Sequence, residues 1–346
     1  MYSCRNNEIH IAFGIQDNTG DYIYYLATTI ISIFEHTSEH ICIHILHDDS
    51  IKNDKKIFLT NIIKKYNNKI KFYLISTDII KTFNITNYSL GAYFRLYIFK
   101  YCKVEKIIYL DSDILVNKDI STFWNINIDN YCCAAIKDLM EERKKINNSY
   151  YKLMGIKYEN YFNSGVMLLN ISNINKKFNV IEEAKSFFEV FKYTPLPDQD
   201  FFNYLLKENT LIVNKKFNFI VKDDVNFTEV INSKYIIHFA GRIKPWCSKN
   251  PEIIYTYYKY MYKCLNENQD EFIIKKMSMI PLKNFEKLIL RDHVKTLSRK
   301  RLCKLLMLIF INIIFKNNKP IDYINKIKRK IRCLYMYLLT KQKIRG

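Results

Sequence analysis

The sequence predicts an α/β protein built on a mainly parallel sheet. Short apolar runs typical of buried strands alternate with segments of helical length between residues 9 and 116. Polar side chains directly follow several of these runs, and open α/β sheets bind their ligands where the carboxyl ends of the strands meet. The 346 residues suffice for one large domain and an appendage.

The expected elements follow this alternation from the amino terminus. The run IHIAFGIQDN predicts a buried strand that leads into a loop, and residues 21–36 predict a helix. HICIHILHDD and KIKFYLI predict two more strands, with a helix over 52–66 between them. We expect a helix over 89–101 and a central strand formed by KIIYLDSDILV. Further strands are predicted at 132–137, 163–169 and 235–239, and further helices at 173–191, 199–207 and 251–264.

Positive charge is concentrated toward the carboxyl end. The net charge is +20, and residues 271–346 hold 20 Lys and Arg against four acidic residues. Such a tail indicates a polyanionic partner, which is acidic lipid, a phosphorylated acceptor or nucleic acid. We therefore expect a nearly neutral α/β body over 1–265 and a basic, amphipathic helical region over 266–346.

Two stretches of this tail suit a membrane surface. Residues 305–315, LLMLIFINIIF, are too short to cross a bilayer, which takes about 20 residues. Residues 323–339 place Ile and Leu on one helical face and Lys and Arg on the rest, which is typical of a helix in the interface of an anionic membrane. The alternative is that the apolar stripe packs on the body. No zinc spacing or recognised nucleic-acid-binding motif occurs, so we expect no nucleic-acid partner.

Cysteine use indicates a reducing compartment. The nine cysteines include no C-x-x-C pair, which is typical of reduced thiols. The start, MYSCRNNEIHIAF, has no basic segment followed by an apolar one, so no export signal is expected. We expect a cytoplasmic protein, peripheral on the inner face of the cytoplasmic membrane.

Asp111 and Asp113 end an apolar run in YLDSDILV, with only Ser112 between them. Two carboxylates this close repel each other, and a divalent cation removes the repulsion. Hard oxygen ligands with open positions suit Mg²⁺ or Mn²⁺ and leave room for phosphate oxygens. Taken alone, the motif is equally compatible with a solvated turn.

His238 favours the metal interpretation. It lies in YIIHFAGRIKPW, at the end of another predicted strand, and imidazole is a common metal ligand. Gly241 would let the backbone approach a phosphate, and Lys244 would neutralise a departing diphosphate. A lone histidine in an apolar strand is ordinarily a core residue, but the G-x-x-K-P-W that follows favours a ligand.

Other polar residues also stand out from their surroundings. Asn163 and Ser164 in YFNSGVMLLN offer neutral hydrogen-bonding groups suited to sugar hydroxyls. Asp198 and Asp200 in LPDQDFFNYLL suit the first turn of a helix, but capping does not explain the specific D-Q-D. Arg95, on an apolar helix, predicts a buried phosphate or carboxylate partner.

Two further patterns carry less weight. His44 and His47, with Asp48 and Asp49, could imitate a metal site, but an edge strand that runs into a turn explains them better. The sequence contains neither G-x-x-x-x-G-K-[ST] nor G-x-G-x-x-G, which argues against ATPase and dinucleotide-dependent classes.

Six segments together resemble the family 8 glycosyltransferases, most closely the branch that extends the lipopolysaccharide or lipooligosaccharide core with glucose or galactose. In chain order they are IAFGIQDN, AYFRLYIF, IIYLDSDILV, YFNSGVMLLN, PDQDFFNYLLK and IIHFAGRIKPW. They extend from about residue 9 to residue 247. The resemblance implies a GT-A fold, a UDP-glucose or UDP-galactose donor and a lipid-linked saccharide acceptor.

The resemblance also implies roles for individual residues. A Mn²⁺ ion would be held by Asp111, Asp113 and His238. The other assignments are Gly14, Gln16 and Asn18 at the uridine, Arg95 at the donor sugar or diphosphate, Ser112 beside the metal ligands, Asn163, Asp198 and Gln199 around the transferred sugar, and Gly241 and Lys244 at the diphosphate. Relatives commonly have Asp where this chain has Gln16 and a stacking Tyr where it has Thr19, so uridine binding is expected to differ at this loop.

The expected reaction is transfer with retention of configuration. The metal and Lys244 would stabilise charge on the leaving diphosphate, and an acceptor hydroxyl would attack from the same face and give its proton to a diphosphate oxygen. Asp198 and Gln199 lie near the place of an enzyme nucleophile, but an amide is a poor one. The alternatives are a family 8 enzyme that acts on a protein or soluble glycan, a protein of the same fold without catalysis and, in a different class, a basic nucleic-acid- or membrane-binding protein without catalysis.

Overall fold

The structure is a computed structural model that describes residues 8–83, 89–138, 148–192, 194–222, 225–241, 244–248 and 250–264. The chain divides into two compact units between Lys244 and Pro245. The basic tail lies outside the described residues, so its amphipathic helices and a domain boundary after residue 265 stay predictions. Within the described ranges, no helix is long and apolar enough to cross a membrane.

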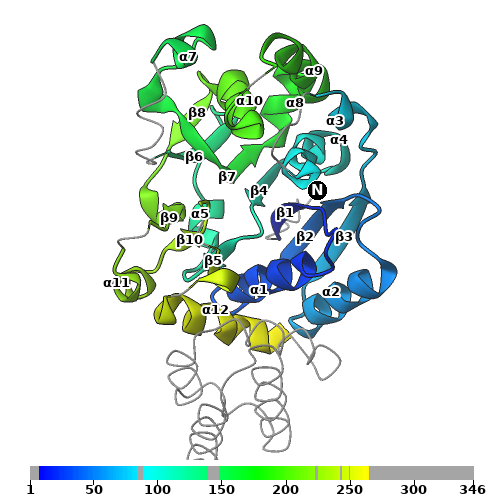
Figure 1. Ribbon diagram of the computed structural model, residues 1–346, viewed down its shortest axis with the longest axis vertical. Helices are drawn as coiled ribbons and strands as arrows, with labels where there is room; N and C mark the ends of the chain where they lie inside the picture. The colour runs from blue at the N-terminus through cyan, green and yellow to red at the C-terminus, as the bar shows by residue number, and fades with distance from the viewer. Residues whose placement is uncertain are drawn as a thin grey trace, which may run out of the picture. The chain divides into compact units, whose positions relative to one another are not determined.

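A seven-stranded sheet forms the centre of the first unit (Figure 1). Its strand order is β3-β2-β1-β4-β7-β6-β8. The strands are β1 Ile9–Ile15, β2 Ile41–His47, β3 Lys69–Leu74, β4 Lys106–Leu110, β6 Cys133–Lys137, β7 Phe162–Asn170 and β8 Thr210–Ile212. Neighbours from β3 to β4 are parallel, β7 is antiparallel to β4 and β6, and β8 is parallel to β6. The mainly parallel α/β sheet is confirmed.

Helices cover both faces of this sheet. In Figure 1, α1 (Tyr22–Phe34) and α2 (Asn53–Lys65) lie on one side, and α4 (Ile98–Tyr101), α8 (Ile171–Lys177) and α9 (Val180–Val190) on the other. Phe187 of α9 packs on Phe201 of α10 (Pro197–Leu206), with ring centroids 5.6 Å apart. The shorter helices are α3 Asp78–Thr82, α5 Ser121–Trp124, α7 Asn148–Leu153 and α11 Phe227–Asn232, and the 3₁₀ turns are η1 Leu90–Tyr97, η2 Tyr158–Asn160 and η3 Lys215–Phe217.

A second, three-stranded sheet lies beside the first. Its order is β5-β10-β9, with β5 Ile114–Val116, β10 Ile236–His238 and β9 Phe219–Ile220. The single strand predicted from KIIYLDSDILV is therefore wrong, because this segment forms β4 in one sheet and β5 in the other. The backbone changes partner at the two aspartates: Asp111 N donates to Gly165 O of β7 at 2.9 Å, and Phe239 N donates to Asp113 O at 3.0 Å.

Two predicted helices also differ from the structure. The helix expected over 173–191 is two helices, because Phe178 and Asn179 take extended backbone conformations between α8 and α9. The segment 89–101 is mostly the 3₁₀ helix η1, which packs tightly on the end of β1. A Cβ atom on Gly91 would lie 2.9 Å from Gln16 N, and one on Gly14 would lie 2.7 Å from Gly91 O.

The described part of the second unit contains a 3₁₀ turn and one helix. These are η4 Pro245–Cys247 and α12 Pro251–Cys264. The rings of Trp246 and Tyr257 pack with centroids 6.0 Å apart. The helix predicted over 251–264 is confirmed.

Candidate active site

A cavity of about 320 Å³ lies at the carboxyl ends of β1 and β4, beside the first residues of β7. Most residues that the sequence assigns to a donor site line it: Gly14, Gln16, Arg95, Asp111, Ser112, Asp113, Asn163, Asp198, Gln199, His238 and Lys244. Asn18, exposed on the loop after β1, and the half-buried Gly241 are not among the lining residues. The fold gathers widely separated segments in one place, and what each residue binds stays a prediction.

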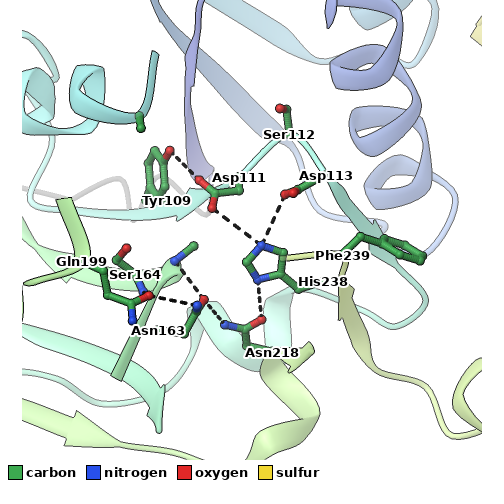
Figure 2. Close-up of polar contacts among 12 residues, drawn as sticks. Tyr109, Asp111, Ser112, Asp113, Asn163, Ser164, Gln199, Asn218, His238 and Phe239 are labelled. Carbon is green, nitrogen blue, oxygen red and sulfur yellow. Dashed lines mark hydrogen bonds and ion pairs between the residues drawn. The ribbon is translucent and has the colours of Figure 1, made fainter. Parts of the chain in front are cut away.

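The carboxylates of Asp111 and Asp113 face the imidazole of His238 (Figure 2). Nε2 of His238 lies 3.3 Å from Oδ1 of Asp113 and 3.7 Å from Oδ2 of Asp111. Strand pairing causes this approach, because β10 runs antiparallel to β5 and His238 stands opposite Ile114. One ligand atom of each side chain lies within 4.8 Å of the other two.

These three side chains fit a divalent cation. Oδ1 of Asp113 is buried and has no hydrogen-bond partner in the part of the chain that the structure describes. A buried carboxylate oxygen without a partner is costly unless a positive charge lies beside it. Two carboxylate oxygens and one imidazole nitrogen suit Mn²⁺ or Mg²⁺ better than a soft metal.

Gly165 of β7 makes room for this group. A Cβ atom at position 165 would lie 2.3 Å from Cε1 of His238 and 2.5 Å from Oδ2 of Asp111. Both distances are far below van der Waals contact, so any larger residue would displace the imidazole or the carboxylate. This role was not predicted, although a glycine inside an apolar strand is a signal of close approach.

Arg95 joins two carboxylates below the cavity. Its Nη2 donates to Oδ1 of Asp111 at 2.7 Å, and its Nη1 pairs with Oδ2 of Asp198 at 3.0 Å. Other donors of the same guanidinium bond to the carbonyl of Ala92 and to Ser164. Burial disfavours the charge, but Asp111 and then Asp198 outweigh it and hold the pKa of Arg95 above its ordinary value. The geometry favours a role in fixing these carboxylates.

Lys244 is paired with Asp113. Its Nζ contacts Oδ2 of Asp113 and donates to the carbonyl of Phe239 at 2.8 Å. Burial disfavours the ammonium, but Asp113 raises the pKa of Lys244. Burial also opposes ionisation of Asp113, but His238 and Lys244 lower its pKa. Lys244 and Asp113 are therefore both charged at neutral pH.

The D-Q-D at the start of α10 sends its side chains to three different partners. Oδ2 of Asp198 accepts from Oγ of Ser164 at 3.2 Å as well as from Arg95. Nε2 of Gln199 donates to Oδ2 of Asp138 at 2.8 Å. Asp200 accepts from the backbone N–H of Leu196 at 3.1 Å, which caps the helix. Capping therefore explains only the third residue, and the first two serve the cavity.

Burial and the neighbouring Arg95 have opposite effects on the pKa of Asp198. The side chain is surrounded by protein, which raises the pKa of its carboxyl, and Arg95 opposes that increase. The carboxylate is thus held by an ion pair and a hydrogen bond instead of by water. Both contacts are made by Oδ2, and the ion pair with Arg95 stabilises the carboxylate charge, which disfavours Asp198 as a nucleophile.

Gln16, in the loop after β1, is held at both ends of its amide by residues from two other segments. Nε2 donates to Oδ2 of Asp48 at 2.6 Å, and Oε1 accepts from Oγ of Ser89 at 3.0 Å. Asp17 is buried and accepts from the backbone N–H groups of Tyr22 and Ile23, so it supports the start of α1. The departure from the family pattern at Gln16 therefore comes with its own supporting contacts.

Several lining or supporting residues were not foreseen. They are Tyr22, Ser89, Gly91, Tyr109, Gly165 and Ala240 in the lining, with Asp138 and Asn218 behind it. Tyr109 donates from its hydroxyl to Oδ1 of Asp111 at 2.8 Å, and Arg95 lies 4.4 Å from the centre of its ring. The chain has 27 tyrosines, so the sequence offered no means of singling out this one.

The histidines of β2 do not form one site with the aspartates that follow. His44 contacts His10 through Nε2 at 3.1 Å and Tyr73 through Nδ1 at 3.0 Å. His47 contacts the carbonyl of Asp48 at 2.7 Å. The two side chains are three residues apart on a strand and therefore point to opposite faces.

The fold is that of known glycosyltransferases. The crystal structure of galactosyltransferase LgtC in complex with donor and acceptor sugar analogs matches with a TM-score of 0.62 at 21% identity, over 76% of this chain and 98% of that chain. The protein has the GT-A fold of glycosyltransferases.

Sequence comparison assigns the family. The family model "Glycosyl transferase family 8" matches residues 10–250. A lipopolysaccharide 1,2-glucosyltransferase of Escherichia coli K12 is 29% identical over 309 residues, which are 82% of this chain and 86% of that protein. A lipopolysaccharide 1,3-galactosyltransferase of Salmonella typhimurium is 29% identical over 258 residues, which are 70% and 74% of the two proteins. The chain belongs to glycosyl transferase family 8.

Proposed function

We propose that this protein transfers a hexose, glucose or galactose, from a UDP-sugar to a lipid-linked saccharide in lipopolysaccharide or lipooligosaccharide core synthesis, with retention of configuration. The two lipopolysaccharide glycosyltransferases that match most of the chain support the acceptor class. The observation that carries the chemistry is the buried Oδ1 of Asp113, which faces His238 within the cavity and has no hydrogen-bond partner among the described residues. A divalent cation at this position would explain both the burial of this oxygen and its approach to the imidazole.

Asp111, Asp113 and His238 would hold Mn²⁺, with Mg²⁺ as the alternative. The bound cation would supply Lewis-acid stabilisation of the leaving diphosphate. Lys244 carries a second positive charge at the same edge of the cavity, and its ammonium is already oriented by Asp113 and the Phe239 carbonyl. Preorganised positive charge costs no reorganisation as the negative charge develops, which is why it contributes strongly to such a step.

The contacts of Asp198 and Gln199 support front-face transfer. Asp198 is held by Arg95 and Ser164. Oε1 of Gln199 accepts two hydrogen bonds, from Nδ2 of Asn163 at 3.0 Å and from the backbone N–H of Ser164 at 3.2 Å. Both contacts of Asp198 go to Oδ2, the ion pair with Arg95 makes this carboxylate a weak nucleophile, and Gln199 offers only an amide. The acceptor hydroxyl would therefore attack from the face that the diphosphate leaves, and a diphosphate oxygen would take the proton. A trapped glycosyl adduct on Asp198 would overturn this mechanism.

A donor screen tests the proposal. Purified protein with Mn²⁺ is given a panel of nucleotide sugars, and hydrolysis without acceptor is measured for each. We expect UDP-glucose or UDP-galactose to be the best substrate, and Asp113→Ala to abolish its hydrolysis. The exposed Asp129, replaced in the same way, is the control. Absence of Mn²⁺-dependent hydrolysis with every nucleotide sugar would contradict the donor assignment.

The basic tail is proposed to hold the enzyme at the anionic inner surface of the cytoplasmic membrane, near its acceptor. Each suitably placed basic residue contributes about 1 kcal/mol at such a surface. The test compares the full chain with a variant in which Lys326, Lys328, Arg329, Lys330 and Arg332 are Gln. We expect the variant to sediment less with vesicles that contain anionic lipid and to retain donor hydrolysis. Equal sedimentation would refute membrane attraction by these charges.

A further inference from the structure

We propose that Asn218 is a positioning residue with two ends, which fixes the metal ligand His238 and at the same time orients the amides of Asn163 and Gln199. Asn218 lies between η3 and β9, does not line the cavity and is 2% exposed. The inference rests on the proposed function for what the site binds, but the contacts that carry it belong to this chain alone.

The first end of Asn218 fixes the imidazole. Its Oδ1 lies 3.0 Å from Nδ1 of His238 (Figure 2). A carbonyl oxygen can only accept, so Nδ1 carries a hydrogen, and in the neutral imidazole that a metal ion requires Nε2 presents its lone pair. That lone pair faces Oδ1 of Asp113 at 3.3 Å. With a neutral imidazole these two atoms are both acceptors, and a divalent cation between them would satisfy both, since a partner on the second nitrogen is how metal-binding histidines are usually oriented.

The second end of Asn218 fixes an amide. Its Nδ2 donates to Oδ1 of Asn163 at 2.8 Å, and the backbone N–H of Gly165 donates to the same oxygen at 3.1 Å. Nδ2 of Asn163 is thereby turned toward Oε1 of Gln199, at 3.0 Å. Nε2 of Gln199 is in turn directed to Oδ2 of Asp138, at 2.8 Å. In this row of hydrogen bonds, which runs from His238 to Asp138, each amide oxygen accepts from the residue before it and each amide nitrogen donates to the residue after it.

Groups that can only accept or only donate a hydrogen bond prevent the amides of Asn163 and Gln199 from flipping. The carboxylate of Asp138 can only accept when ionised, and the backbone N–H groups of Ser164 and Gly165 can only donate. A flipped Asn163 or Gln199 would set two acceptors or two donors against each other in a buried place, at a cost of about 1–3 kcal/mol for each group left without a partner. Asn218 is the member that joins this order to the metal ligand.

Two substitutions separate the two ends. Asn218→Asp keeps an acceptor for Nδ1–H of His238 but sets a second oxygen against Oδ1 of Asn163. Asn218→Leu has a similar size and removes both hydrogen bonds. Asn214→Asp is the matched control, because Asn214 is exposed in the same loop and its side chain only accepts, from the backbone N–H of Lys216.

The measurements are the Mn²⁺ dissociation constant, from the electron paramagnetic resonance signal of free Mn²⁺ in a titration, and kcat and KM for UDP-sugar hydrolysis. We expect Asn218→Leu to weaken Mn²⁺ binding about 10- to 100-fold, the usual effect of removing a partner behind a metal ligand. We expect Asn218→Asp to bind Mn²⁺ within about threefold of the unaltered protein but to lose at least about tenfold in kcat. Asn214→Asp should match the unaltered protein in both measurements.

Three outcomes would overturn the inference. Unchanged Mn²⁺ affinity in Asn218→Leu would refute the positioning of His238 by Asn218. Unchanged kcat in Asn218→Asp would refute the orientation of Asn163 and Gln199 by Asn218. Equal loss of affinity in both variants means that Asn218 serves only local stability. If no nucleotide sugar is hydrolysed by the unaltered protein, the proposed function fails, and the Mn²⁺ titration still decides the first end.

Discussion

Nε2 of His238 lies 3.3 Å from Oδ1 of Asp113; His238 is the last residue of β10, and Asp113 directly precedes β5, which pairs antiparallel with β10 in the small sheet. Neither atom has a hydrogen to offer the other when the carboxyl is ionised and Nδ1 of the imidazole is the protonated nitrogen. Because this geometry is built into β5 and β10, the metal site should respond to changes that alter its shape without removing a ligand.

Gly165→Ala should disable the site while every ligand remains. The added methyl would collide with Cε1 of His238 and Oδ2 of Asp111. We expect Mn²⁺ affinity and donor hydrolysis each to fall at least about tenfold. Gly20→Ala is the control: its φ of +76° makes the substitution strained, but no atom of the described residues lies within 4 Å of the added carbon. It should lower thermal stability and leave Mn²⁺ affinity unchanged. Equal affinity in Gly165→Ala would contradict the steric argument.

Removing Arg95 should destabilise the protein strongly, because Asp111 and Asp198 would lose a buried counter-charge. Loss of one member of a buried ion pair costs about 3–5 kcal/mol. We expect Arg95→Met to lower the free energy of unfolding in urea by an amount in that range. Adding Asp198→Asn should cost less in the Arg95→Met background than in the unaltered protein, because the carboxylate is already unpaired there. Additive losses would show that the pair is not coupled.

Gln16→Ala should raise KM for the donor more than it changes kcat. Gln16 lines the cavity directly after β1 and is not one of the three residues predicted to hold the metal, so we expect its contacts to serve binding. Asp48→Ala should give part of the same increase, because Asp48 orients the Gln16 amide. The neighbouring Asp49 is exposed, and its replacement by Ala is the control. A fall in kcat at constant KM would place Gln16 at the reacting bond instead.

Acid should destabilise the first unit through His44. Burial, and after it His10, lowers the pKa of His44 to about 3. Its pKa in the unfolded chain is about 6.5, so between these values the unfolded state binds the proton and the folded state does not. The free energy of unfolding is therefore not reduced by His44 above about pH 6.5, and it decreases as the pH falls below that value. Urea unfolding between pH 7 and 5 should show a shallower decline for His44→Gln than for the unaltered protein, with exposed His40→Gln as the control.

The sequence predicted the site better than it predicted the elements that build it. Asp111 and His238 could be placed together because strand ends converge at one edge of an α/β sheet, whatever the exact pairing. The division of KIIYLDSDILV between two sheets could not be predicted, because both halves are apolar and hydrophobic periodicity does not reveal which strand will be the neighbour. The segment divides at the two aspartates because β4 pairs with β7 and β5 pairs with β10.

Residues whose hydrogen-bond partners come from distant segments could not be predicted from the sequence for the same reason. Asn218 and Asp138 stand in stretches with no distinctive spacing, and Asn is abundant in this chain. Their roles depend on the side chains that arrive from β7, β10 and α10. Gly165 is the exception, because a glycine between Ser164 and Val166 in an apolar strand already indicated that something must approach the backbone closely.

The change of sheet at the aspartates has a mechanical consequence. Asp111 is anchored to β7 of the large sheet through its backbone N–H, whereas His238 belongs to the small sheet and Asp113 is bonded to its extension at Phe239. A cation held by all three would cross-link the two sheets. Ion binding and cohesion of the fold would then share one free energy, and each tenfold excess of Mn²⁺ over its dissociation constant would add about 1.4 kcal/mol to the work of separating them.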